Sequence, residues 1–334
     1  MKSITISKIA ELADVSKTTV SRVLNKKPDV SAKTRERIEE IIRQYNFSPN
    51  AFASAILKKK SDTIALVIPY EETYIMFNPY YSDVIRGVSN EIKKHGYYLM
   101  LIYTSTQDYL AAIRQKRIDG LIMLSPGTSH HDMIENILEH DIPFVSSSKL
   151  EGFDGVPSIV ADDFNGAIYA VEHLVSLGHK RVGFINGPEI LSSSKERLRG
   201  YKHVLKKAGI EYDASIVTNG DTSIESGYNI AKRYLDSPGL SAIFTGSDLM
   251  AIGAISAINE AGLSVPENIS LVGFDDMLFS SYLNPPLTTV RQHAFEKGRL
   301  AARTLVGIIK GEPVEHKITM PVELIIRKST TRKL

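Results

Sequence analysis

Short apolar stripes with the spacing of amphipathic helices fill the first 45 residues of the chain. The first stripe has apolar residues at i, i+3, i+4 and i+7: Ile6, Ile9, Ala10 and Ala13. Asp14 interrupts this stripe, and Ser16 is placed to cap a second helix over residues 17–25. A third stripe begins after a capping Ser31, runs through Ile38, Ile41, Ile42 and Tyr45, and ends before Pro49. The pattern predicts three short helices, with a tight turn between the first two.

From Thr63 onward the pattern changes, because buried strand-like runs alternate with amphipathic helices. The clearest strand-like runs cover residues 64–68, 98–103, 120–124, 181–185, 242–245 and 271–274. Such alternation is typical of βαβ units and predicts parallel sheets with helices on both faces. About 270 residues exceed a comfortable single core, so we expect two lobes.

The predicted layout of the first three helices is that of a helix-turn-helix, whose second helix lies in the DNA major groove. On the face opposite Val20 and Val23 we expect base contacts from Lys17, Thr18 and Arg22. Hydroxyl and amide groups suited to phosphate oxygens surround that face: Ser16, Thr19, Ser21, Asn25, Ser31 and Thr34. A helical adaptor with a solvated basic face is the alternative that this pattern leaves open.

The charge distribution supports a polyanion-binding head. Residues 1–60 carry 13 Lys and Arg against 6 Asp and Glu, whereas the remainder carries 27 against 32. A basic head on a mildly acidic body is typical of a nucleic-acid-binding module joined to a second function. The chain has no cysteine, which excludes disulfides, thiolate metal sites and cysteine nucleophiles. With no apolar run of about 18 residues and no signal-peptide core, we expect a cytoplasmic protein without a membrane span.

Polar and aromatic side chains follow several of the predicted strands. Open parallel sheets bind ligands beyond the carboxyl ends of their strands, where loops converge. The candidates at such ends are an aromatic pair, carboxylates, a guanidinium and a hydroxyl: Tyr80, Tyr81, Asp162, Arg197, Ser247 and Asp275. This set suits a polyhydroxylated ligand such as a sugar. Taken singly, the residues have structural explanations, since Asp163 and Asp248 are placed to cap helices and tyrosines often pack in cores.

The head closely resembles the DNA-binding domain of LacI/GalR transcriptional regulators. The resemblance rests on Ile4-Thr5-Ile6, Asp14-Val15-Ser16, residues 18–25, Val30-Ser31, Thr34-Arg35 and residues 48–51. It implies a helix-turn-helix head over residues 1–48 and a hinge over residues 49–61 that becomes helical on operator DNA. In this hinge Ala53, Ile56 and Leu57 are implied to meet the minor groove, with either Ile56 or Leu57 as the inserted side chain.

The rest of the chain resembles the effector domain of the same family. Matching stretches include residues 177–181, Arg199-Gly200-Tyr201, Val265-Pro266-Glu267, residues 272–276 and residues 286–290. The resemblance implies an α/β periplasmic-binding-protein-like domain over 62–334, with two doubly wound parallel-sheet lobes. Lobe 1 would comprise 62–161 and 292–320, and lobe 2 would comprise 162–291 and 321–334. The implied effector contacts are Tyr81, Asp162, Arg197, Ser247 and Asp275, and Thr222 occupies a position where the family often has an aromatic residue.

We therefore expect a homodimeric, DNA-binding repressor of carbohydrate-utilisation genes that responds to a sugar-like effector. One alternative is a catabolite-control-type regulator that binds a phosphorylated carrier protein, because Arg299 and Arg303 lie one turn apart on a predicted helix and could receive a phosphate. More distant alternatives are a solute-binding protein and a sugar-processing enzyme. No nucleotide-binding, metalloprotease or hydrolase motif occurs, so we expect no catalytic residues, no cofactor and no metal.

Overall fold

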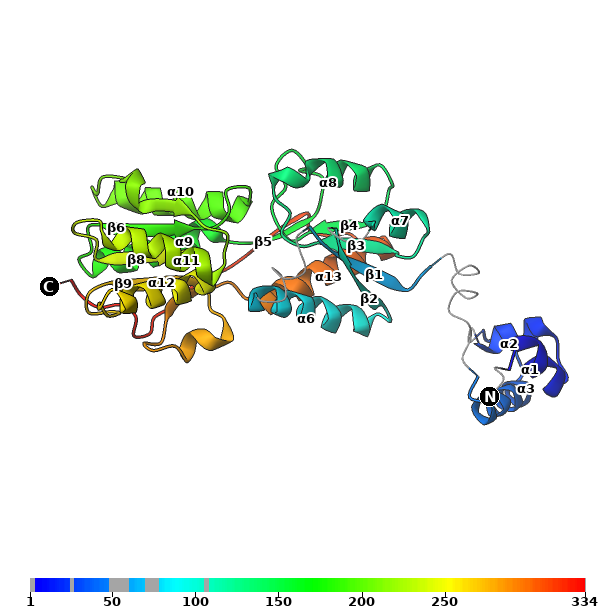
Figure 1. Ribbon diagram of the computed structural model, residues 1–334. Coiled ribbons are helices and arrows are strands. Elements are labelled where there is room, and N and C mark those ends of the chain that lie inside the picture. Colours follow the sequence, from blue (N-terminus) through cyan, green and yellow to red (C-terminus); the bar gives the residue numbers. More distant parts are fainter. Residues whose placement is uncertain (1–3, 25–26, 48–59, 70–77, 105–107, 334) are drawn as a thin grey trace. The chain divides into compact units, whose positions relative to one another are not determined.

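A computed structural model describes residues 4–24, 27–47, 60–69, 78–104 and 108–333. The chain divides into two compact units, Met1–Ser61 and Asp62–Leu334 (Figure 1). We call the first unit the head and the second the body, and we describe each by itself.

The head contains the three predicted helices: α1 (Ile6–Leu12), α2 (Lys17–Leu24) and α3 (Ala32–Gln44). Each helix begins at a hydroxyl cap. Thr19 N donates to Ser16 Oγ at 3.0 Å and Thr34 N donates to Ser31 Oγ at 3.2 Å, which confirms both predicted caps. A third cap at Thr5, which the sequence pattern did not reveal, accepts from Lys8 N at 3.3 Å.

The apolar stripes of the three helices meet in one small core. Its buried members are Ile9, Ala10, Ala13, Val20, Val23 and Ile38. The turn between α1 and α2 places Asp14 at φ 48°, a left-handed conformation that Asp tolerates better than most residues. The Arg37 guanidinium donates to the Ala13 carbonyl and thereby ties α3 to the end of α1. Tyr45, which the third stripe places inside, is instead 49% exposed, because α3 ends at Gln44 and Tyr45 lies beyond its last turn.

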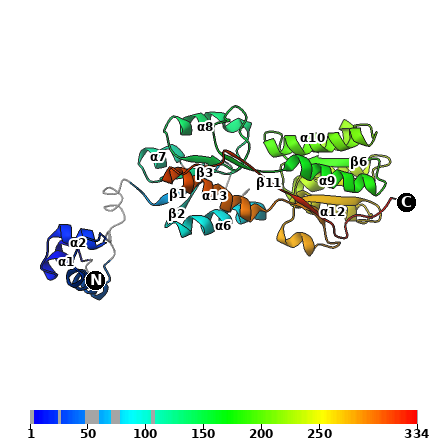
Figure 2. The same cartoon turned by 180° about the vertical axis from the view of Figure 1, so that it is seen from behind.

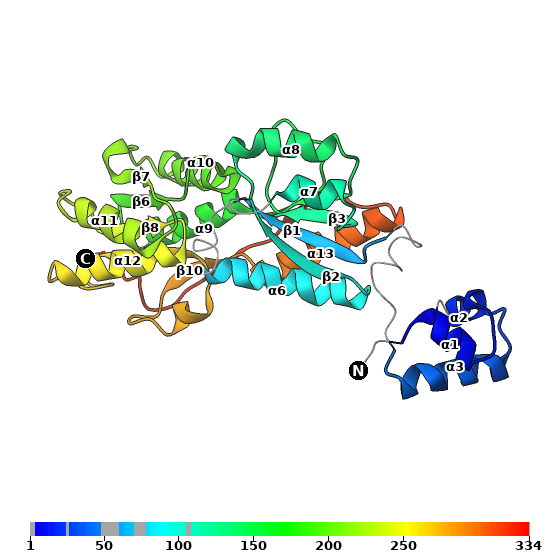
Figure 3. The same cartoon turned by 45° about the vertical axis from the view of Figure 1, so that its right-hand side comes forward.

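Lobe 1 of the body is built on a parallel sheet with the strand order β11-β5-β4-β3-β1-β2. Its strands are β1 (Thr63–Ile68), β2 (Tyr98–Tyr103), β3 (Gly120–Met123), β4 (Phe144–Ser146), β5 (Ser158–Ala161) and β11 (Lys317–Met320). Helices α6 (Pro79–Lys94) and α13 (Ala294–Lys310) cover one face, and α7 (Tyr109–Arg114), η1 (Thr128–His130) and α8 (His131–Leu138) cover the other (Figure 3).

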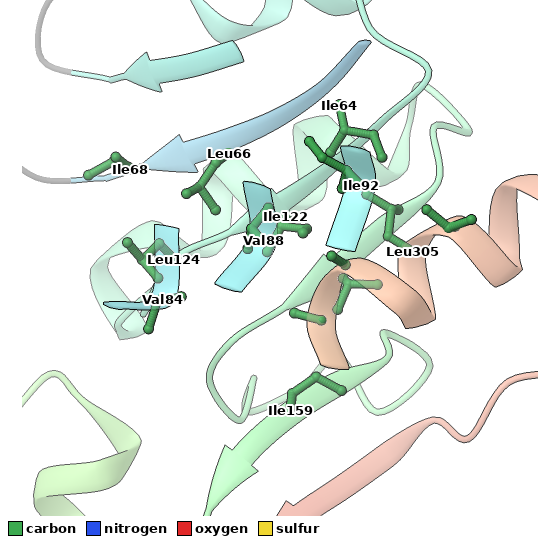
Figure 4. Close-up of a cluster of buried hydrophobic side chains, with 14 of the residues drawn as sticks. Ile64, Leu66, Ile68, Val84, Val88, Ile92, Ile122, Leu124, Ile159 and Leu305 are labelled. Carbon is green, nitrogen blue, oxygen red and sulfur yellow. The ribbon is translucent and has the colours of Figure 1, made fainter. Parts of the chain in front are cut away.

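Helices α6 and α13 pack tightly together on the sheet. Figure 4 shows side chains of α6, such as Val84 and Val88, and of α13, such as Leu305, gathered against strand residues including Leu66. Gly87 and Gly298 permit the close approach of the two helices, because a Cβ at either position would overlap a backbone carbonyl of the other helix. This contact fixes the position of α13 relative to the start of α6.

Lobe 2 has a second sheet with the order β12-β10-β9-β8-β6-β7. Figure 2 shows this lobe from behind, with strand β6 and helices α9, α10 and α12 labelled. Its strands are β6 (Val182–Asn186), β7 (Val217–Asn219), β8 (Ala242–Thr245), β9 (Ser270–Asp275), β10 (Thr288–Arg291) and β12 (Glu323–Ile325). One face packs against α9 (Asp163–Ser176) and α10 (Ser192–Lys207), and the other packs against α11 (Ile224–Leu235) and α12 (Asp248–Glu260). Two short 3-10 turns complete the lobe, η2 (Ala214–Ile216) and η3 (Leu278–Ser281).

The chain passes between the sheets three times, after β5, after β10 and after β11. Strand β12 is antiparallel to β10, whereas the other strand pairs are parallel. The reason is that β11 ends at the inter-lobe edge, so the chain enters lobe 2 at the edge where its parallel strands finish. The predicted fold class, a helical head followed by two parallel-sheet lobes, is confirmed. Within the described ranges, the helices are all too short or too polar to cross a membrane.

Candidate functional site

The predicted DNA-reading face lies on the exposed side of α2. Lys17, Thr18 and Arg22 are exposed, whereas Val20 and Val23 on the opposite side are buried. Arg22 Nη1 lies 3.2 Å from Asp29 Oδ2, and both side chains are about half exposed. An exposed pair of this kind is worth only about 0–1 kcal/mol. A stronger bidentate acceptor, such as a guanine edge, could therefore displace Asp29.

Two of the predicted phosphate contacts, Ser16 and Ser31, also cap helices, and the hydroxyl of each lies against that of another predicted contact. Ser16 Oγ and Thr19 Oγ1 lie 2.9 Å apart, and Ser31 Oγ and Thr34 Oγ1 lie 2.8 Å apart. Each of these contacts uses one hydroxyl hydrogen, so one hydrogen of each pair is left for a phosphate oxygen. Ser21 is half-buried on α2. Asn25 and the hinge residues lie outside the described residues: Ala53, Ile56 and Leu57.

A polar cavity of about 340 Å³ lies between the two lobes of the body. All seven predicted effector residues line it: Tyr80, Tyr81, Asp162, Arg197, Thr222, Ser247 and Asp275. They come from both lobes and from the carboxyl ends of strands or the helices that follow them. Because they converge from six separate segments, the cavity is a product of the tertiary fold and can grip a small ligand from both sides.

Arg197, on α10, is the most firmly held of these residues. Its Nε and Nη2 lie 2.9 and 2.7 Å from Asp163 Oδ1, and Nη1 donates to the Gly246 carbonyl. The guanidinium also lies 3.6 Å from the centroid of the Phe274 ring. The side chain is only 9% exposed. These contacts hold Arg197 in one position, so it can present its remaining donor capacity to a ligand with little loss of entropy.

Asp275 ends β9 at φ 121°, next to Asp276 at φ 56°. The bend is held because Asp276 pairs with Arg291 at 2.7 Å and with Arg327 at 2.6 Å. Gln292 donates from Nε2 to Asp275 Oδ1. Burial raises the pKa of Asp275 above its usual range, while Arg197 acts in the opposite direction. A carboxyl that can carry a proton can donate to or accept from a sugar hydroxyl.

The helix caps at the cavity differ from the predicted ones by one residue. Asp162 caps α9 by accepting from Asn165 N at 3.2 Å, and Ser247 caps α12 by accepting from Met250 N at 3.2 Å. The interpretation of Asp163 and Asp248 as caps is therefore wrong, because both lie inside the first turn and point to other partners. Asp163 pairs with Arg197, as described above.

Asp248 organises the loops beneath the cavity. It is fully buried and accepts from Met277 N at 2.9 Å, Ser280 Oγ at 2.6 Å and Thr289 Oγ1 at 2.5 Å. Burial raises the pKa of Asp248, and these donors oppose that rise. Since its oxygens are occupied by the protein, Asp248 supports the site without lining it.

The aromatic side of the cavity belongs to lobe 1. Tyr81 is 4% exposed and packs edge-on against Tyr80, with 5.2 Å between the ring centroids, so much of Tyr81 belongs to the core. Tyr80 accepts a hydrogen bond at Oη from Lys297 Nζ, at 3.0 Å. On the lobe 2 side, Thr222 has φ 70°, a strained conformation for a β-branched residue and one that often marks ligand-facing positions.

Sequence reasoning missed several lining residues, and two of them are buried polar residues, Gln292 and Lys297. Lys297 lies in the buried stripe of α13, four residues before Ala301 and eight before Leu305, and is itself 6% exposed. A charged residue at an apolar position of a helical stripe is the signal that could have revealed it. Gln292 follows β10 directly at an inter-lobe crossing and carried no comparable signal.

The two lobes also touch beside the cavity. Ser148 Oγ in lobe 1 lies 3.1 Å from Ser192 Oγ at the start of α10. Glu151 in lobe 1 accepts from Lys195 Nζ of the same helix at 3.1 Å. These contacts close one side of the cavity, and they would have to break if the lobes moved apart.

The basic pair considered as a receptor for a phosphorylated protein already has a partner. Arg299 Nε and Arg303 Nε lie 3.2 and 3.3 Å from the two carboxylate oxygens of Glu91, whose side chain is 4% exposed. Lys94, 2.7 Å from Glu91, together with these arginines holds the pKa of Glu91 at about 2. Because both guanidinium groups are already paired with Glu91 within lobe 1, they are less available to a phosphate than isolated surface arginines.

The residues described include no cluster of three or more His, Asp or Glu placed to hold a metal ion. The polar groups of the cavity are instead those that bind hydroxyl groups and charged substituents.

Comparisons with known proteins agree with this arrangement. Residues 5–50 match the bacterial regulatory proteins, lacI family, and residues 171–330 match a periplasmic binding protein-like domain. The HTH-type transcriptional regulator DegA of Bacillus subtilis (strain 168) is 32% identical to this chain, with 98% of each chain covered.

Two solved structures extend the comparison to three dimensions. The lac repressor dimer bound to operator and the anti-inducer ONPF has a TM-score of 0.87 at 30% identity, covering 99% of this chain and 100% of that one. The complex of the transcriptional regulator CelR with cellobiose has a TM-score of 0.75 at 31% identity, covering 98% and 99%. A helix-turn-helix head followed by two lobes around a polar cavity defines a ligand-responsive, DNA-binding transcriptional regulator. The chain belongs to the lacI family of these regulators.

Proposed function

We propose that the chain is a homodimeric repressor of carbohydrate-utilisation genes and that a small, sugar-like effector in the inter-lobe cavity controls its binding to operator DNA. The observation that carries this proposal is the cavity itself, in which Arg197 and Asp275 of lobe 2 face Tyr80 of lobe 1. The similarity to the lac repressor–operator complex supports operator DNA as one ligand, and the similarity to the CelR–cellobiose complex supports a sugar-like effector as the other.

In the head, Lys17, Thr18 and Arg22 are proposed to contact base edges in the major groove. Their exposure on one face of α2 supports this role, as does the net basic charge of residues 1–60. The capping pairs Ser16–Thr19 and Ser31–Thr34, with Ser21 and Asn25, are proposed to bind phosphates. Ala53, Ile56 and Leu57 are proposed to contact the minor groove.

Dimerisation would place two heads on a pseudo-palindromic operator, whose symmetry mirrors that of the protein. Two large apolar side chains support a dimer contact in lobe 2. Leu278, in η3, is 82% exposed, and Tyr282, directly after η3, is 81% exposed. Exposed apolar side chains so close together are typical of a protein interface. A second copy of the chain is the occupant that the lac repressor dimer suggests.

Effector binding would act through the relative position of the lobes. The cavity is lined from both lobes, and lobe 1 is the one whose first strand follows the head in the chain. A ligand that favours one arrangement of the lobes changes the population of DNA-competent dimers. The coupling is reciprocal, so an effector that weakens operator binding must itself bind more weakly to the operator-bound dimer.

We also propose that the protein is not an enzyme and acts in the cytoplasm. The support is that its relatives are transcriptional regulators and that two buried carboxylates at or beside the cavity, Asp163 and Asp248, are occupied by other protein groups. Operator DNA as the partner supports the cytoplasmic location.

An unbiased selection from random duplexes tests the proposal. The purified full chain should enrich one pseudo-palindromic sequence at moderate ionic strength, and a sugar that raises its Tm should shift its affinity for that sequence. An Arg22→Ala variant provides the matched control, because it keeps the body intact and should enrich poorly. A full-length chain with no sequence preference, with or without sugars, would rule the proposal out.

A further inference from the structure

Lys297 is a buried cation without a carboxylate partner among the residues that the structure describes. Its side chain lines the inter-lobe cavity and the residue is 6% exposed. Its Nζ donates one hydrogen bond, to the neutral Tyr80 hydroxyl at 3.0 Å. An ammonium group has three donors and no acceptor, so two N–H bonds of Lys297 have no acceptor among the described protein groups.

This situation is costly for the protein alone. Removing an ammonium group from water is strongly unfavourable unless an opposite charge compensates for the lost hydration. A phenol oxygen supplies one hydrogen bond but no charge. A buried, uncompensated lysine does not stabilise the fold. Because Lys297 lines a cavity, a negatively charged ligand that enters the cavity accounts for its presence more readily.

The other charged residues of the cavity do not supply the missing negative charge. Arg197 is paired with Asp163, and Arg199 is paired with Glu196 at 2.8 Å, so these four residues neutralise one another.

Three lysines remain, Lys149, Lys297 and Lys317, against two carboxylates, Asp162 and Asp275. Asp162 is committed to the cap of α9, and Lys149 and Lys317 are exposed. With the exposed lysines counted, the lining has one more cation than carboxylates, and neither Asp162 nor Asp275 forms an ion pair with Lys297 among the described contacts.

The fold positions Lys297 for this task. Gly87 of α6 and Gly298 of α13 allow the two helices to approach closely, which brings Lys297 of α13 to Tyr80 at the start of α6. The Tyr80 hydroxyl restrains the ammonium within the cavity. Arg197 and Asp275 line the same cavity from lobe 2, where they suit hydroxyl groups.

We propose that the effector is an anionic polyol, a sugar phosphate or a sugar acid, whose negative group binds Lys297 beside Tyr80 while its hydroxyl groups bind lobe 2. The inference rests on the proposed function and specifies the effector class for the same cavity. Charge-assisted hydrogen bonds are about twice as strong as neutral ones, which makes Lys297 a determinant of specificity.

Binding of anions to three forms of the full chain tests this inference: wild type, Lys297→Met and Lys310→Met. Methionine keeps the length and burial of the side chain and removes its charge. Lys310 lies on the same helix but does not line the cavity, so Lys310→Met is the matched control. The probes are inorganic phosphate, glucose 6-phosphate, ribose 5-phosphate, gluconate and the neutral parent sugars, each at constant ionic strength and measured by calorimetry and thermal shift.

We expect at least one anionic probe to bind wild type and Lys310→Met more tightly than its neutral parent sugar does. The same probe should bind Lys297→Met about 10- to 100-fold more weakly than it binds wild type. Preference for the phosphorylated probes or for gluconate identifies which negative group the site takes. Tyr80→Phe, which removes only the hydroxyl, should weaken the same probe about fivefold and provides a second readout. The inference is overturned if every anionic probe binds wild type and Lys297→Met equally, or binds neither.

Two further measurements separate this inference from the proposed function. Without ligand, Lys297→Met should be at least as stable as wild type, because it removes an uncompensated buried charge; a marked loss of stability would assign Lys297 a purely structural role. Operator binding by ligand-free Lys310→Met, whose substitution lies outside the cavity, should equal that of wild type. Failure of all forms to bind any operator contradicts the proposed function, whereas normal operator binding without anion selectivity contradicts only this inference.

Discussion

Replacing Arg197 should separate the stability of the body from its response to an effector. The guanidinium pairs with Asp163 through two nitrogens, donates to the Gly246 carbonyl and lies against Phe274. In Arg197→Ala, Asp163 would remain as a buried carboxylate, 10% exposed, without its cation.

The size of the effect follows from this burial. Breaking a buried ion pair by removing one partner costs about 3–5 kcal/mol, largely because the other charge stays uncompensated. The free energy of unfolding of Arg197→Ala should therefore fall by about that amount. Adding Asp163→Asn removes the stranded charge, so the double variant should recover at least about 1 kcal/mol relative to the single one.

Urea unfolding followed by circular dichroism measures both stabilities, and operator binding with and without the best sugar ligand measures the response. The double variant should bind operator normally and should not respond to the ligand, because its guanidinium is absent. A double variant no more stable than Arg197→Ala would refute the reasoning about the stranded charge. A normal ligand response in the double variant would remove Arg197 from the effector site.

Three other predictions concern base reading, acid stability and assembly. Arg22→Ala should lose about 1–3 kcal/mol of discrimination for the operator, measured by competition with random DNA; equal losses on both DNAs would contradict a base contact. Glu91, whose pKa is held at about 2, stabilises the fold at neutral pH and loses this contribution as the pH falls from about 4.5 toward 2. Glu91→Gln should therefore lower the free energy of unfolding by roughly 1–3 kcal/mol at pH 7, allowing for the exposed partners, with the difference shrinking below pH 4; a pH-independent difference would exclude this linkage. Leu278→Asp with Tyr282→Asp should shift sedimentation toward the monomer and weaken operator binding, and an unchanged dimer would place the interface elsewhere.

Much of the fold could be predicted because it follows from local patterns. The helical stripe of Ile6, Ile9 and Ala10 and the hydroxyl caps at Ser16 and Ser31 depend on residues only a few positions apart. The alternation of apolar runs and amphipathic helices in the body has the same local origin. Tyr45 shows the limit of this reasoning, since continuing the stripe of α3 placed it inside although the helix ends before it.

The sequence predicted where the candidate site lies but not which of its residues cap helices or form ion pairs. Strand ends and the family resemblance were enough to collect seven side chains that line one cavity. They did not reveal that Asp162 and Ser247 act as caps, or that Asp163 holds Arg197. A one-residue shift of a cap changes which carboxylate faces a ligand, and no local pattern distinguishes the two positions.

The amino-acid sequence by itself determined the helices, the strands, the basic head and the class of fold, because periodicity, capping and charge segregation act over short distances. Only the tertiary structure decided which charges are neutralised and which remain available. Lys297 meets Tyr80 across 217 residues of sequence, and Arg299 meets Glu91 across 208. Such partnerships depend on the strand order and on the contact between α6 and α13, so the charge that the cavity offers to a ligand is a property of the folded chain.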